Sequence, residues 1–309
     1  MMTWKKDRRY LVQTLPWVLV TMVLMACSTA PSTKILTDKW DITHSKAAQL
    51  FQECRTGLAL EEYYKVLYLA ELRDDQEGIA TALLNLGTIQ MVRGDFKEAE
   101  QQLDQARKRF GMLGDVVATL QVEISLATLL VRQGRLQPGI EAFQHALRRL
   151  ALEKRASPIL KVIILNGLAM AYKGLDQYPS AYVSLDQAEK LARELDASKD
   201  LASTLMNRAR VDFQQGKIDI AKKGVLQALD LDRAMENVLG IGADLLLLGM
   251  IEEQQGLMDR ARNHYRQADS IFDYCGLERS RFFTAEQIRH LDSRKDESML
   301  WKNKELGGR

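Results

Sequence analysis

Proline, histidine and aromatic residues are all scarce in this sequence of 309 residues. The five prolines leave the helices predicted below largely uninterrupted, and Pro158 falls at an expected helix start, where proline is tolerated. Aromatic residues make up only 7% of the chain, which fits a core packed mainly with Leu, Ala and Val. The hydrophobic content of 46% is sufficient for such a core to run through the chain.

The sequence also lacks the residue patterns that carry chemistry. Its four histidines, His44, His145, His264 and His290, show no HxH or HxxxH spacing, and a metal site needs three or four converging ligands. No nucleophile–base set, phosphate-binding loop or pair of acids at catalytic spacing is present. We therefore expect a protein that is not an enzyme and has no metal and no cofactor.

The first 26 residues have the pattern of a secretory leader. Four basic residues near the start precede an apolar run over 11–26, which is about 16 residues long, short for a membrane span and typical of a signal-peptide core. The run ends Leu24-Met25-Ala26-Cys27, which resembles a bacterial lipobox, although Met25 is larger than the usual residue there. The resemblance implies cleavage before Cys27 and its lipidation, palmitate included; an uncleaved anchor is the alternative.

Lipidation would place the protein on a membrane. Ser28 follows the cysteine instead of the aspartate that marks inner-membrane retention in such lipoproteins, so the resemblance implies an outer-membrane anchor facing the periplasm. The leader holds four basic residues and one acid, so the remainder of the protein would carry a net charge of about −1 instead of +2. A protein this close to neutral has no broad cationic field, and we expect no nucleic-acid partner. Residues 27–43 are rich in Ser and Thr without periodicity, which indicates a tether.

Alanines recur at a nearly constant interval through the rest of the sequence. Ala70, Ala106, Ala146, Ala188, Ala228 and Ala268 stand 36, 40, 42, 40 and 40 residues apart. Small residues recur seven and nineteen positions before most of these alanines, and large apolar residues three positions before them. Glycines fall twelve positions before four of them, with Asp176 in the corresponding place of another. The pattern predicts pairs of amphipathic helices joined by tight turns, in a stacked-repeat protein.

This pattern resembles the tetratricopeptide repeat, most clearly in "NLGTIQMVRGDFKEAEQQLDQA" (85–106) and "GLAMAYKGLDQYPSAYVSLDQA" (167–188). The period near 40 is longer than usual, and the proline that commonly closes a repeat is missing. The resemblance implies an all-α, right-handed superhelical solenoid of about six helix pairs with a C-terminal capping helix. The domains predicted are a signal peptide (1–26), the tether (27–43), the solenoid (44–278), and a capping helix with a polar tail (279–309).

In this fold the first helix of each repeat lines a concave groove, which binds a protein or peptide partner. Amides, adaptable methionine side chains, few charges and one aromatic residue fall on that face. The predicted groove residues are Asn85, Thr88, Thr128, Asn166, Met170, Lys173, Met206, Arg210, Phe213 and Met250.

Two cysteines remain once Cys27 is set aside. Cys54 lies in the first repeat and Cys275 beyond the last, which are far apart in an open solenoid, whereas a disulfide needs Cα atoms within ~7 Å. We expect two free, partly buried thiols, with an intermolecular bond as the alternative.

The sequence thus predicts a membrane-anchored scaffold or adaptor for cell-envelope assembly, which binds a protein partner in its groove. The alternative is a periplasmic sensor that binds a small peptide or metabolite and changes its superhelical pitch.

Overall fold

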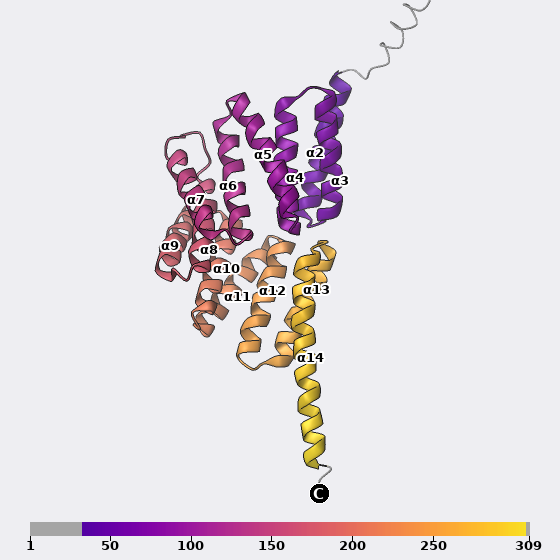
Figure 1. Cartoon of the computed structure of the whole chain (residues 1–309), viewed down its shortest axis with the longest axis vertical. Coiled ribbons are helices and arrows are strands. Elements are labelled where there is room, and N and C mark those ends of the chain that lie inside the picture. The colour runs from indigo at the N-terminus through magenta and orange to yellow at the C-terminus, as the bar shows by residue number, and fades with distance from the viewer. Residues whose placement is uncertain (1–32, 307–309) are drawn as a thin grey trace, which may run out of the picture.

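Helices form nearly the whole of the region that the computed structural model describes, residues 33–306 (Figure 1). Their bounds are α2 Thr33–Gln52, α3 Thr56–Leu72, α4 Gln76–Arg93, α5 Phe96–Leu113, α6 Val116–Arg132, α7 Leu136–Leu150, α8 Ile159–Gly174, α9 Tyr178–Glu194, α10 Ser198–Gln214, α11 Ile218–Ala234, α12 Val238–Gln254, α13 Met258–Tyr274 and α14 Glu278–Leu306.

Each helix packs chiefly on its neighbours in sequence, which makes six antiparallel pairs from α2–α3 to α12–α13 and leaves α14 against α13. The all-α solenoid expected from the repeats is confirmed. Figure 1 shows that the pairs do not form a straight stack: α2 to α7 make the upper half, and the later pairs curve back beneath them until α13 lies below α3.

The alanine ladder explains how the pairs pack. Ala106, Ala146, Ala188, Ala228 and Ala268 are all 0% exposed, and the small residues seven positions before them are also buried. Small side chains at these crossings let the two helix backbones approach closely while large neighbours fill the grooves. The turns between helices are as expected too: Gly94, Gly134, Gly216 and Gly256 have φ between +71° and +93°, and Asp176 takes the same conformation at +57°.

The first repeat follows a different register from the one read on Ala70. Helix α3 begins at Thr56, ten residues before the fully buried Val66, as each later second helix begins ten residues before its ladder alanine. In this register Ala47 and Ala59 occupy the two small positions and Tyr63 the large one, and all three are buried. The first interval is therefore also 40 residues. Ala70 misled the alignment because it is buried one helical turn further along the same face.

The expected tether is wrong from Thr33 onward, where α2 begins. Leu36, Ala47 and Leu50 of α2 are buried, and Trp40 packs partly buried between them at helical spacing. The Trp40 ring also stacks on His44, with centroids 4.9 Å apart, and the Arg73 guanidinium lies 5.6 Å from its centroid. This apolar stripe is spread among Ser, Thr and Lys residues, so local composition hid it. The predicted signal peptide and Cys27 lie outside the described residues.

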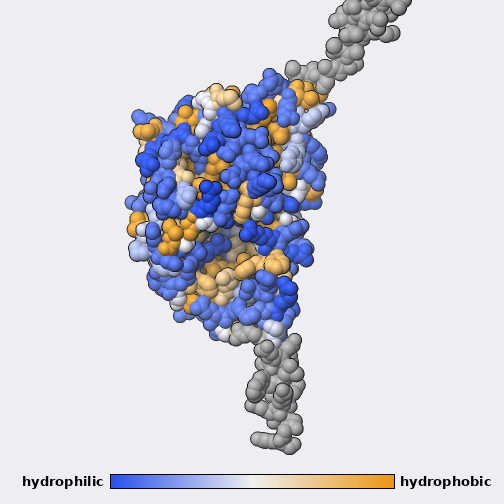
Figure 2. Space-filling view, viewed as in Figure 1, coloured by the Kyte–Doolittle hydropathy of each residue, from blue (hydrophilic) through white to orange (hydrophobic). Residues whose placement is uncertain are grey.

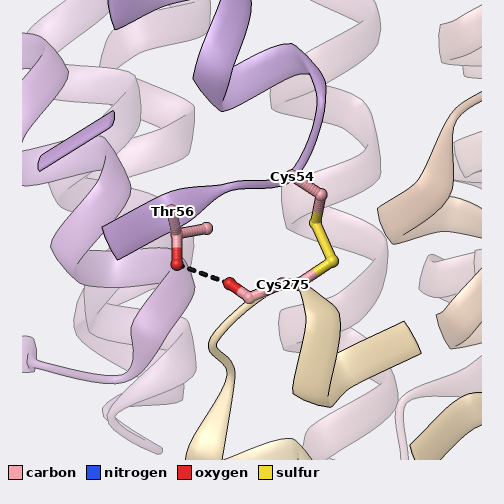
Figure 3. Close-up of a disulfide and its surroundings, with 3 residues drawn as sticks. All are labelled: Cys54, Thr56 and Cys275. Carbon is pink, nitrogen blue, oxygen red and sulfur yellow. Dashed lines mark hydrogen bonds between the residues drawn. A yellow bond between two sulfur atoms is a disulfide. The ribbon is translucent and has the colours of Figure 1, made fainter. Parts of the chain in front are cut away.

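The expectation of two free thiols is wrong: Cys54 and Cys275 form a disulfide, with Cα atoms 4.9 Å apart (Figure 3). Cys54 lies in the turn between α2 and α3, in the position that glycine holds in later repeats, and has φ +63°. Cys275 caps the C-terminus of α13. The bond therefore joins the first helix pair to the last and closes the solenoid into a ring.

Further contacts support the closure around the disulfide. The buried Thr56 hydroxyl donates a 2.6 Å hydrogen bond to the Cys275 carbonyl (Figure 3). Val92 of α4 packs against the apolar cluster that the later helices of the ring form. The Arg279 guanidinium lies 5.1 Å from the centroid of the Phe96 ring. The prediction of two free thiols failed because the ends of the solenoid meet only through the total curvature of six helix pairs. No local pattern in the sequence indicates that total.

Candidate functional site

Four of the predicted groove residues meet in one cavity on the inner face of the ring. Lys173 of α8, Arg210 and Phe213 of α10, and Met250 of α12 line a cavity of about 410 Å³. All four lie on first helices of their pairs, as the resemblance implied. Volumes of this order are typical of ligand clefts in proteins. We name this space the inner cavity.

A second hollow adjoins the inner cavity and reaches the last helix of the ring. Its volume is about 310 Å³, and Leu246 and Phe283 line both spaces. Arg132 of α6 and Arg279 of α14 stand on its wall, together with Phe96 of α5. Figure 2 shows apolar side chains gathered around a hollow in the lower half of the visible face, at the height of α11 and α12. The combined site is thus built from both halves of the solenoid.

The site carries an excess of positive charge. Among the described residues, Arg132, Lys173 and Arg210 take part in no ion pair within 4.0 Å. Desolvation and then the nearby Arg210 lower the pKa of the Lys173 ammonium, and desolvation followed by Arg279 lowers the pKa of Arg132. Arg132 is solvent-accessible, but it projects into the concavity, where other helices surround it. These cations therefore lie near one another without a direct ion pair, although the carboxyl groups of Asp176 and Asp244 act on Lys173 and Arg210 from beyond ion-pair distance.

A buried acid lies behind this cationic wall. Asp244 of α12 is 0% exposed, and neither of its carboxylate oxygens has a hydrogen-bond donor among the described residues. Burial, followed by the charge of the neighbouring Asp232, raises the pKa of Asp244 to about 8. Asp232 itself accepts a 2.8 Å hydrogen bond from the Asn237 amide. The two carboxyl groups repel each other when both are charged, so burial and this repulsion together favour the protonated form of Asp244.

This acid predicts a pH dependence of stability. An acid whose pKa is raised in the folded state keeps its proton there while the unfolded protein releases it. The stabilising effect of Asp244 is fully present below about pH 4 and is lost as pH rises toward 8. We expect Asp244→Asn, which stays neutral, to have a flatter curve of unfolding free energy against pH between 5 and 8, measured by urea titration.

The control for this prediction is Asp230→Asn, which changes an exposed acid near the end of α11. This variant should keep the wild-type pH dependence. A slope in Asp244→Asn as steep as that of wild type would contradict the role given to Asp244.

The other predicted groove residues are largely occupied within the fold. The side chains of Asn85, Thr88 and Thr128 each donate to a backbone carbonyl four residues earlier on their own helix. Met170 and Met206 pack partly buried against apolar clusters of the core.

Asn166 is also engaged. It is 9% exposed, and its amide donates to the Thr204 hydroxyl at 2.8 Å while its oxygen accepts from Asn207 at 3.2 Å. Its amide is therefore already bonded across α8 and α10 and is poorly placed to bind a partner.

Several residues of the site were not predicted, among them Arg132, Leu246, Arg279 and Phe283. Leu246 could have been found, because it stands 22 positions before its ladder alanine, as Asn166 and Met206 stand before theirs. Arg279 and Phe283 belong to α14, which was expected only to cover the last repeat. Its first turns instead line the site, because ring closure brings them opposite α4 and α5.

Comparison with known proteins agrees with this architecture. The Tetratricopeptide repeat family matches residues 78–151, which span α4 to α7. A curated relative, "Tetratricopeptide repeat protein 19 homolog, mitochondrial" from Drosophila melanogaster, is 25% identical over 213 residues. The match covers 65% of this chain and 58% of that protein, so the chain spans less than two thirds of the relative.

Solved structures share the fold at low sequence identity. A Rap protein complexed with Competence and Sporulation Factor superposes with a TM-score of 0.60 at 13% identity, covering 84% of this chain and 76% of that one. Aspartyl phosphate phosphatase F from Bacillus subtilis gives 0.58 at 14% identity, covering 87% and 75%. These likenesses establish the solenoid architecture. Within the region that the structure describes, no helix is both long and apolar enough to span a bilayer.

Proposed function

We propose that this protein is a scaffold that binds a segment of another protein inside its ring. The observation that carries the proposal is the meeting of Lys173, Arg210, Phe213 and Met250 in one cavity with an apolar floor. Apolar side chains there can take up the side chains of a bound segment, while the unpaired cations add specificity. The tetratricopeptide-repeat match and the solenoid fold support a role in protein–protein interaction.

The scaffold would be anchored to the outer membrane through lipidated Cys27 and act in assembly of the cell envelope. The leader and the Leu24-Met25-Ala26-Cys27 sequence support this proposal. The Cys54–Cys275 disulfide gives it further support, because such bonds persist in oxidising compartments outside the cytosol. Metabolic labelling with an alkyne analogue of palmitate should mark the wild type and not Cys27→Ser. Equal labelling of both would contradict lipidation at Cys27.

Site-specific photocrosslinking in cells tests the scaffold. A benzophenone amino acid at position 213 or 250 should crosslink a partner protein, because both side chains line the inner cavity. The same group at Gln227, an exposed position on the second helix α11, is the matched control and should not. Partner bands at position 227 but not at 213 or 250 would overturn the proposal.

A sensor of a small peptide or metabolite is the second candidate, and the limited volume of the cavities favours it. The Rap protein complexed with Competence and Sporulation Factor is an example of a similar fold in a complex. A sensor should give a ligand-dependent rise in melting temperature with no protein crosslinked at positions 213 and 250.

A further inference from the structure

The first three repeats expose a large apolar side chain where each second helix ends. Leu72, Met112 and Leu152 each stand six residues after the buried ladder position of their repeat, and they are 52%, 80% and 85% exposed. The same position holds Glu194 and Ala234 in the fourth and fifth repeats, so the feature is confined to one part of the solenoid. The exposed apolar residues at these three junctions are Leu72, Met112, Leu113, Val116 and Leu152, which we name the apolar rim.

The apolar rim follows one edge of the ring. Figure 1 shows the α3–α4, α5–α6 and α7–α8 junctions along the upper edge, with the start of α2 beside the first of them. The Arg109 guanidinium donates a hydrogen bond to the Gln76 amide oxygen, which joins the second junction to the first. In Figure 2 apolar side chains reach the surface at several points along this edge.

Helix α2 extends beyond the first junction. The Arg73 guanidinium at the end of α3 lies 5.6 Å from the centroid of the Trp40 ring, so Trp40 is level with this junction. Thr33 stands seven residues before Trp40, which is about 10 Å along a helix. The chain therefore enters the ring at the edge that carries the apolar rim.

Positive charge accompanies the second and third junctions. Residues 107–116 hold three bases and one acid, and residues 148–155 hold four bases and one acid. Lys108, Arg148 and Lys154 are exposed, and none of them forms an ion pair within 4.0 Å among the described residues. The first junction differs, since residues 71–77 hold four acids and one base.

We propose that the apolar rim rests on a lipid surface, with anionic headgroups opposite the second and third junctions. Five residues separate Cys27 from Thr33, and a fully extended chain covers that interval in about 20 Å. A ring anchored through a lipid on Cys27 thus stays close to the membrane with this edge toward it. Exposed Leu and Met beside Lys and Arg suit the boundary between headgroups and acyl chains. The inference rests on the proposed lipid anchor and adds the face that the ring turns to the membrane.

Depth-dependent fluorescence quenching tests the inference on the full-length lipidated protein in vesicles of phosphatidylglycerol and brominated phosphatidylcholine. Met112→Cys or Leu152→Cys carries the fluorophore, because the native Cys54 and Cys275 are bonded and buried. The control is Arg260→Cys, an exposed position in the first turn of α13, whose junction with α12 lies at the lower edge (Figure 1). Bromine should quench positions 112 and 152 about threefold more strongly than position 260, because only the rim enters the lipid.

Paired variants measure the contribution of the apolar side chains. With the fluorophore at position 112, Leu72→Ser/Leu152→Ser should lose about half of the quenching, because two of the groups that hold the rim in the lipid are gone. Ile220→Ser/Leu226→Ser removes two exposed apolar side chains from α11 and should be quenched like wild type. Both variants change exposed residues, and equal melting temperatures exclude misfolding as the cause.

Flotation of the same vesicles separates this inference from the lipid anchor. Protein that floats but shows no more quenching at 112 and 152 than at 260 would overturn the apolar rim and leave the anchor standing. Protein that does not float would remove both. A photocrosslink in cells from position 152 to another protein or a second copy, without quenching in vesicles, would assign the rim to a protein interface and overturn the inference.

Discussion

Reduction of the Cys54–Cys275 disulfide is expected to cause a large loss of stability and to open the ring. The bond spans 221 residues of sequence, and loop-closure entropy gives about 5 kcal/mol for a loop of that length. The helix pairs otherwise contact mainly their neighbours, so few other contacts hold the two ends together. Wild type with and without reductant should differ by many degrees in melting temperature, followed by circular dichroism.

The reduced protein has the same residues as the oxidised protein, so the comparison isolates the covalent bond. Small-angle X-ray scattering of the two states should show a larger radius of gyration after reduction. Cys54→Ala/Cys275→Ala should behave like the reduced wild type and should no longer respond to reductant. Identical melting and scattering with and without reductant would mean that packing at Thr56 and Val92 closes the ring by itself.

Gly167→Ala is expected to destabilise the solenoid by about 3 kcal/mol, the upper part of the range for overpacked cores. A Cβ atom at position 167 of α8 would stand 2.5 Å from Cε2 of Phe143 and still closer to Cζ. The Phe143 ring is 0% exposed and belongs to a cluster of buried apolar side chains, which would have to shift if the ring moved aside. In an unpacked helix the same change would stabilise by about 1 kcal/mol, so the sign of the effect is diagnostic.

Two further variants check the origin of that effect by urea titration. Gly111→Ala is the matched control, since Gly111 is also helical and a Cβ there meets nothing within 4 Å; it should be neutral or slightly stabilising. Phe143→Leu should rescue Gly167→Ala in part, because the shorter side chain leaves room for the new methyl group. If the losses of unfolding free energy in the two single variants simply add in the double variant, the Phe143 side chain and the new methyl group at position 167 do not collide.

Local patterns predicted most of the architecture because each repeat is stabilised by near neighbours. The ladder alanines, the glycines of the turns and Asp176 at φ +57° all stood at positions that the repeat pattern had marked. The first repeat was misaligned by one helical turn, since Ala70 and Val66 lie on the same buried face of α3. A terminal repeat has a neighbour on only one side, so its sequence is under fewer constraints with which to fix the register.

The candidate site was predicted in part. Lys173, Arg210, Phe213 and Met250 come from one face of successive first helices, and their periodic positions were enough to group them. Asn166 has the same periodicity but is bonded to Thr204 and Asn207, a pairing that depends on how α8 and α10 meet. Periodicity assigns a face to a residue and cannot say whether that face is already occupied.

The sequence by itself determined the fold class, the helix pairs and the face of each pair that turns inward, because these depend on residues three to forty positions apart. Only the tertiary structure decided that the solenoid closes, that Cys54 meets Cys275, and that Arg132 shares a hollow with Arg279 and Phe283. Those contacts depend on the small rotation between successive pairs, summed over the whole solenoid. Such a sum is set by side-chain packing at every crossing, which no single segment of sequence encodes.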